Sequence, residues 1–132
     1  SEMLEDFEEI QKEAHSKGLP VITWIYPRGK SIESQSKTKL MAYATRVALE
    51  IGADIVKIQP VGNLKDLKWA VASAGKVKVV SAGGAKTSEK DFLNQIKLYT
   101  KAGFSGLAVG RNVWQAKEPL TITSKIKKII WK

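Results

Sequence analysis

The chain has 132 residues, 43% hydrophobic and 27% charged, which is enough for one compact domain with a hydrophobic core. It has no cysteine and one histidine, which excludes disulfides, thiolate metal sites and a multi-histidine metal site, and no apolar run reaches the ~20 residues of a membrane span. The formal charge of +9 favours anionic partners. We expect phosphorylated metabolites and not nucleic acid, because the lysines are scattered over the predicted helices and the aromatic residues do not interleave with a basic stripe.

The predicted elements repeat one pattern: a helix, a glycine, a short apolar strand, and a polar or glycine-bearing loop. Four glycines are placed to end helices in a left-handed conformation: Gly18, Gly52, Gly75 and Gly103. The predicted strands are Val21–Tyr26, Ile55–Gln59, Val77–Ser81 and Gly106–Val109. An amphipathic helix over residues 1–17 precedes them, and further helices are predicted at about Lys39–Ile51, Leu64–Ala74, Ser88–Ala102 and Ile122–Ile130. This alternation predicts parallel βα units.

Such units could form half of an eight-stranded barrel or a small open sheet wound by helices. The unusual residues fall at the carboxyl end of a predicted strand or in the loop after it: Tyr26, Lys57, Ser81 to Gly84, and Gly110 with Arg111. Parallel barrels build their active sites at that face. We therefore expect an α/β fold of the (β/α)8 TIM-barrel type, with residues 1–132 as a single domain.

Lys57 is the most informative residue, because it lies in the middle of a strand otherwise suited to burial. A charged ammonium is costly there unless it is paired or loses its proton, and a neutral lysine can attack a carbonyl to form a Schiff base. The other interpretation is a lysine that extends to solvent and has no chemical role. Side-chain alternation places Lys57 on the face opposite Val56 and Ile58, which we expect to pack on helices.

The first strand carries two aromatic residues that alternation places on one face, Trp24 and Tyr26. If this face looks into the same cavity as Lys57, the Tyr26 phenol could act as a general acid or base beside an amine-derived iminium. Taken singly, Tyr26 could also be a half-buried ring with a solvated hydroxyl, and Trp24 could simply fill the core.

Two glycine-bearing loops have the chemistry of a phosphate site. Ser81-Ala82-Gly83-Gly84 and Gly110-Arg111-Asn112 each follow a strand, where backbone N–H groups can converge on an anion and Arg111 adds a bidentate donor. Arg28 and Lys30 follow the first strand and could hold a second phosphate or face solvent. Glycines in tight turns are often only structural, so the pair of loops is more informative than either alone.

Four motifs together resemble the archaeal-type class I fructose-1,6-bisphosphate aldolases. They occur in the family's order at Trp24–Gly29, Gly52–Lys57, Ala82–Thr87 and Val109–Gln115. The resemblance implies a (β/α)8 barrel that cleaves fructose 1,6-bisphosphate to dihydroxyacetone phosphate and glyceraldehyde 3-phosphate, with no metal or other cofactor. It further implies a cytoplasmic homo-oligomeric enzyme of glycolysis and gluconeogenesis.

The same resemblance implies roles for individual residues. Lys57 would be the Schiff-base lysine and Tyr26 the proton-transfer residue. Substrate would be bound by Trp24, Arg28, Ser81, Ala82, Gly83, Gly84, Gly110 and Arg111. Ala82 and Ala85 stand where the family often has serine, glycine or proline, and residues 59–63 also differ from the common sequence, which bears on the identity of the substrate.

The resemblance covers only the carboxyl-terminal half of the family's barrel, strands five to eight. A half-barrel leaves sheet edges and one side of its core exposed. We therefore expect this chain to pair with a missing amino-terminal half-barrel or to form a homo-oligomer. The alternatives to the main function are a related lysine-dependent aldolase or transaldolase, such as the enzyme that makes the aminodideoxyheptulosonate precursor of aromatic amino acids, and a non-catalytic phosphosugar-binding half-barrel.

Overall fold

The computed structural model describes residues 2–131 and contains one sheet of four parallel strands in the order β1-β2-β3-β4. The strands are β1 (Ile22–Trp24), β2 (Ile55–Ile58), β3 (Lys78–Ala82) and β4 (Gly106–Ala108). The helices are α1 (Glu2–Ser16), α2 (Lys37–Glu50), α3 (Leu64–Ser73), α4 (Glu89–Ala102), α5 (Arg111–Trp114) and α6 (Pro119–Ile130), with a short 3-10 helix η1 at Lys30–Ile32. Consecutive parallel pairing of every strand with the next confirms the predicted run of βα units. Within the described range, no helix is both long and apolar enough to cross a membrane.

The turns between helices and strands have the expected backbone conformation. The four predicted helix-ending glycines all have positive φ, from 56° at Gly75 to 100° at Gly103. At the other end of α4, the Ser88 hydroxyl accepts a hydrogen bond from the Asp91 backbone N–H at 3.1 Å. The sequence pattern did not predict η1 or α5, because elements of three or four residues are too short to show a periodicity.

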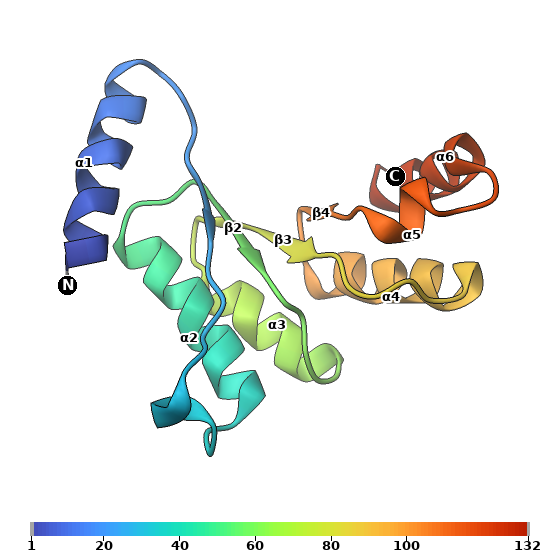
Figure 1. The fold of residues 1–132 in the computed structure, drawn as a ribbon, viewed down its shortest axis with the longest axis horizontal. Helices are drawn as coiled ribbons and strands as arrows, with labels where there is room; N and C mark the ends of the chain where they lie inside the picture. The colour runs from blue at the N-terminus through green and yellow to red at the C-terminus, as the bar shows by residue number, and fades with distance from the viewer. Residues whose placement is uncertain (1, 132) are drawn as a thin grey trace.

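The helices α2 and α3 cover one face of β2 and β3, and α4 to α6 lie on the β4 side of the sheet (Figure 1). The helix-facing side chains of the two central strands are fully buried: Val56, Ile58 and Val79 are at most 1% exposed. Burial of each such side chain stabilises the fold by roughly 1.5–3 kcal/mol. A second apolar cluster joins α4 and α6 through Phe92, Ile96, Ile122 and Ile126.

Within residues 2–131, no second layer covers the opposite face of the sheet, which we call the uncovered face. Ile22 is 53% exposed and Trp24 is 66% exposed on β1, whereas Thr23 between them is buried. Lys57 and Val80 on this face are half-buried. The uncovered face is the side of the sheet that a complete barrel would enclose.

Only part of the predicted apolar side of α1 is buried against the rest of the fold. Phe7 packs against the main core cluster, but Met3 is 76% exposed and Ile10 is 64% exposed. Leu4, at 41%, is also exposed. The helix is instead held by polar contacts near its carboxyl end.

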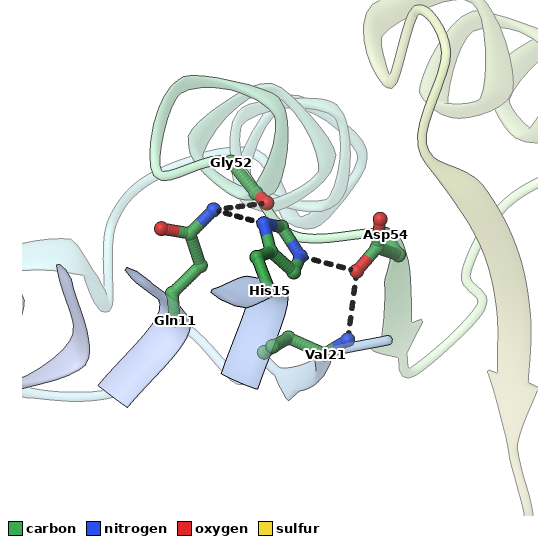
Figure 2. Close-up of polar contacts among 5 residues, drawn as sticks. All are labelled: Gln11, His15, Val21, Gly52 and Asp54. Carbon is green, nitrogen blue, oxygen red and sulfur yellow. Dashed lines mark hydrogen bonds and ion pairs between the residues drawn. The ribbon is translucent and has the colours of Figure 1, made fainter. Parts of the chain in front are cut away.

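Figure 2 shows these polar contacts, which tie α1 to the segments that precede β1 and β2. The His15 imidazole Nε2 lies 2.8 Å from the Asp54 carboxylate, which also accepts the Val21 backbone N–H at 2.7 Å. Gln11 Nε2 lies 2.8 Å from His15 Nδ1 and donates to the Gly52 carbonyl oxygen at 3.2 Å. Because Gln11 donates to Nδ1, this arrangement suits the imidazole tautomer whose Nε2–H donates to Asp54. The Val21 N–H and the His15 imidazole together hold the pKa of the Asp54 carboxyl below its ordinary value.

We predict that Asp54→Asn destabilises the folded chain by about 1 kcal/mol at pH 7, because the partly exposed carboxylate loses its charge-assisted hydrogen bonds. The folded pKa is lower than the unfolded one. The stabilisation is therefore fully present above the unfolded value, about 3.9, and is lost as the pH falls through the folded value. Urea unfolding at pH 7 and pH 3 measures the difference between wild type and variant, which we expect to shrink at pH 3. Asp6→Asn, on the exposed surface of α1, is the control. A difference of equal size at both pH values would contradict this role of Asp54.

Candidate active site

Lys57 occupies the uncovered face of β2, near the carboxyl end of the strand. In the sheet register it lies between Trp24 of β1 and Val80 of β3. Its chain neighbours Val56 and Ile58 point into the helix-covered core, as side-chain alternation predicts. Lys57 itself is half-buried, because no second layer of described residues covers this side of the sheet.

The Lys57 ammonium is paired with an aromatic ring. Its Nζ lies 3.6 Å from the centroid of the Trp24 ring, which is a cation–π contact. Among residues 2–131, the basic members of the ion pairs are Lys12, His15, Lys17, Arg46 and Lys125, and not Lys57. The costly mid-strand charge is thus accommodated by partial exposure and by Trp24.

A cleft of about 650 Å³ opens beside Lys57 at the carboxyl ends of β1 and β2. Tyr26 and Lys57 both line it, from neighbouring strands. Tyr26 lies just beyond the last residue of β1, and the Arg28 guanidinium carbon lies 5.8 Å from the centroid of its ring. The cleft therefore combines an amine, a phenol and a guanidinium, the groups that the sequence predicts at this rim.

The two glycine loops lie at the same end of the sheet. Ala82 and Gly83 line the large cleft together with Lys57. They also line a smaller cavity of about 230 Å³, which Ser81, Gly84 and Asn112 share with them. The two cavities share three lining residues, Gln59, Ala82 and Gly83. Gly110 and Arg111 follow β4, and the Gly83 backbone N–H donates to the Ala108 carbonyl oxygen at 3.0 Å, which brings the two loops into contact.

Several of the predicted ligands do not line the cleft beside Lys57. Ser81 is 1% exposed and pairs in register with Ile58, so its side chain lies on the helix-facing side of β3. Trp24 contacts Lys57 but does not line the cleft, and Gly110 and the exposed Arg111 line neither cavity. The binding roles of these residues remain predictions.

Other residues of the two cavities were not predicted from the sequence. The segment after β1 supplies Glu33 and Gln35 to the cleft, and α2 supplies its first residue, Lys37, together with Leu40 and Met41. The rule that barrel loops after strand carboxyl ends form the site could have found the first three, whereas Leu40 and Met41 depend on how α2 packs. In the smaller cavity, burial raises the pKa of the Tyr99 hydroxyl.

Comparison with known proteins gives one consistent result. Residues 1–116 match the family model described as DeoC/LacD family aldolase. The chain is 43% identical over 130 residues to a fructose-bisphosphate aldolase class 1 of Halobacterium salinarum and 42% identical over 130 residues to one of Thermoproteus tenax. It covers 49% of each relative, so it spans about half their length.

Solved structures agree with these relatives. The crystal structure of an archaeal fructose 1,6-bisphosphate aldolase matches 98% of this chain with 42% identity and a TM-score of 0.91, and 52% of that protein is covered. A second archaeal fructose-1,6-bisphosphate aldolase, solved with its catalytic lysine covalently bound to the carbinolamine intermediate of the substrate, matches 99% of this chain with 39% identity, a TM-score of 0.92 and 53% coverage. The fold is therefore that of half a TIM-barrel aldolase, as the four predicted βα units suggested.

We predict that Trp24→Leu makes Lys57 about 2- to 5-fold more reactive toward an acylating reagent, because it removes a cation–π contact of roughly 0.5–1 kcal/mol. The modification rate of Lys57 is followed by peptide mass mapping. The fold should be retained, since Trp24 is 66% exposed. Trp69→Leu, at a 47% exposed position of α3, is the control. An unchanged Lys57 rate in Trp24→Leu would show that the ring does not protect the amine.

Proposed function

Because this chain belongs to the DeoC/LacD family of aldolases, we propose that it provides the Schiff-base half of a class I fructose-1,6-bisphosphate aldolase. The reaction is the reversible cleavage of fructose 1,6-bisphosphate into dihydroxyacetone phosphate and glyceraldehyde 3-phosphate, without a metal or organic cofactor. The observation that carries the proposal is the shared cleft of Lys57 and Tyr26 at the carboxyl ends of adjacent parallel strands. The identity of 42–43% to two proteins named fructose-bisphosphate aldolase class 1 supports the choice of substrate.

Lys57 acts as the nucleophile in this mechanism. Its unprotonated Nζ attacks the C2 carbonyl of the sugar to form a carbinolamine, which loses water to give a protonated imine. The positive imine nitrogen accepts the electron pair of the C3–C4 bond when that bond breaks. The product is an enamine of dihydroxyacetone phosphate on Lys57, and glyceraldehyde 3-phosphate departs.

Tyr26 transfers the protons. The C4 hydroxyl must lose its proton as the C3–C4 bond breaks, and C3 of the enamine must gain one before hydrolysis releases dihydroxyacetone phosphate. Tyr26 is the phenol that lines the cleft with Lys57, so it can serve both steps. The Arg28 guanidinium above its ring adds positive charge at this end of the cleft, where we place the phosphate of the aldehyde product.

We assign the phosphate of dihydroxyacetone phosphate to the two glycine loops. The backbone N–H groups of Gly84 and Gly110 donate to no protein acceptor in the described part of the chain, and Arg111 contributes an exposed guanidinium. Gly83 connects this region to the cleft of Lys57. A phosphate fixed at this position holds the C2 carbonyl near Lys57, so that the binding of the phosphate orients the carbonyl for attack by the amine.

The complete reaction is expected to need a cover for the uncovered face of the sheet. Lys57 is half-buried in this chain, and a partner that covers this face would exclude water from the imine. We propose a missing amino-terminal half-barrel or a second copy of this chain as that cover. The proposed enzyme acts in the cytoplasm, where its phosphorylated substrates are found.

We predict that borohydride reduction in the presence of dihydroxyacetone phosphate fixes the sugar to Lys57. Peptide mass mapping should find the adduct in wild type and lose it completely in Lys57→Ala. Lys78→Ala is the control and should retain the adduct on Lys57. Lys78 is the first residue of β3, at the end of the sheet away from the cleft. A folded wild-type chain that yields no adduct would contradict the proposal for this chain and favour the phosphosugar-binding alternative.

The proton-transfer role of Tyr26 predicts a separable effect. Tyr26→Phe should still form the Lys57 adduct, but deuterium exchange at C3 of dihydroxyacetone phosphate should slow by roughly 10²- to 10⁴-fold. Mass spectrometry of the recovered ketone measures this exchange. Tyr43→Phe, at a 65% exposed position of α2, should exchange at the wild-type rate. Equal exchange in Tyr26→Phe and wild type would assign proton transfer to another group.

A further inference from the structure

The two glycine loops meet backbone to backbone at Gly83. Its N–H donates to the Ala108 carbonyl oxygen at 3.0 Å. A Cβ atom at Gly83 would lie 3.2 Å from the Val109 Cα and 3.5 Å from the Gly110 backbone nitrogen. The loops can approach this closely because residue 83 has no side chain, so their separation is set by direct contact at this end.

Asn112 joins the same two loops at the other end. Its side-chain Oδ1 accepts a hydrogen bond from the Thr87 backbone N–H at 2.8 Å, and its Nδ2 donates to the Ala85 carbonyl oxygen at 3.1 Å. Asn112 is 8% exposed, whereas Ala85 and Thr87 are both exposed. A buried carboxamide therefore holds an exposed loop through both of its polar atoms. Lys86 adds a third link, because its ammonium donates to the Gln115 carbonyl oxygen.

Gly84 lies in the chain between these points of contact. The 83–87 loop is fixed at Gly83 by backbone contact and at residues 85 and 87 by Asn112, which restricts the direction of the Gly84 N–H between them. Asn112 belongs to α5, which begins directly after Gly110. The same residue therefore places the donors of one loop relative to those of the other.

We infer that Asn112 is a positioning residue for the phosphate site: it fixes the 83–87 loop against the 109–112 turn so that the backbone donors of both converge on one phosphate. This inference rests on the proposed function, because it takes the two loops as the phosphate ligands. Both polar atoms of the Asn112 side chain bond to the 83–87 loop, so the role we infer is exerted through the loops. Small displacements of positioned donors reduce binding strongly.

The inference predicts a split between phosphate binding and amine chemistry. Asn112→Ala should weaken the affinity for inorganic phosphate by roughly 10-fold or more, because the loop loses two part-buried hydrogen bonds that position its donors. The same variant should trap unphosphorylated dihydroxyacetone on Lys57 by borohydride reduction as wild type does, since that ligand has no phosphate for the loops to hold. Asn94→Ala, at an exposed position of α4, is the matched control and should change neither property.

The test is an NMR titration of the chain with inorganic phosphate, followed at the amides of Gly83, Gly84 and Gly110. Weaker binding in Asn112→Ala with unchanged dihydroxyacetone trapping would support the inference. Equal phosphate affinity in Asn112→Ala and wild type would overturn the role of Asn112 while leaving the proposed function intact. Absence of phosphate-dependent shifts in wild type would overturn the phosphate site itself, and the inference with it.

A measurement on the wild-type chain covers the case in which Asn112→Ala does not fold. Thr87 lies in an exposed loop outside helices and strands, so its amide should exchange rapidly with solvent unless Asn112 holds it. The inference predicts hydrogen-exchange protection of the Thr87 amide well above that of the neighbouring Lys86 amide. Equal, rapid exchange at both amides would overturn it.

Discussion

The burial of Val56 and Ile58 against α2 and α3 determines the direction of Lys57, which lies between them on β2. Each of the two aliphatic side chains stabilises the helix-covered side of the sheet by roughly 1.5–3 kcal/mol. A shift of the strand by one residue would place the Lys57 ammonium in that core and expose the aliphatic residues. The packing of the core thus keeps the amine on the uncovered face, where a carbonyl can reach it. The cation–π contact with Trp24 and the cleft shared with Tyr26 both depend on this orientation.

The two ends of the parallel sheet have different roles: contacts before the strands stabilise the fold, and residues after the strands form the candidate active site. Before β1 and β2, the carboxylate of Asp54 joins α1 to the sheet through His15 and the Val21 N–H. After the strands, Lys57 and Tyr26 line the cleft together with Ala82 and Gly83 of the first glycine loop, which the second glycine loop contacts. Both arrangements arise because all four strands are parallel. The loops that precede the strands therefore lie at one end of the sheet, and the loops that follow the strands lie at the other. Changes to Asp54 should therefore affect unfolding without altering the geometry of the cleft.

Much of this organisation could be predicted from the sequence. The helix-ending glycines and the alternation around Lys57 gave the order of the elements and the face of the lysine, because both depend on local backbone geometry. The position of Ser81 on the helix-facing side of β3 follows from the register with β2, which the sequence does not determine. The role of Asn112 was missed for a similar reason: its partners are 25 and 27 residues away, and only the folded sheet brings them together. The exposure of Met3 and Ile10 differs from the simple amphipathic expectation, because that side of α1 does not pack against the other described residues.

The most direct test of the account is a crystal structure of the chain after borohydride reduction with dihydroxyacetone phosphate. The account predicts the reduced sugar bonded to Lys57 Nζ on the uncovered face, with its phosphate held between the 83–84 and 110–111 backbone donors. A sugar bonded to a different lysine, or a phosphate directed away from both glycine loops, would contradict the proposed site.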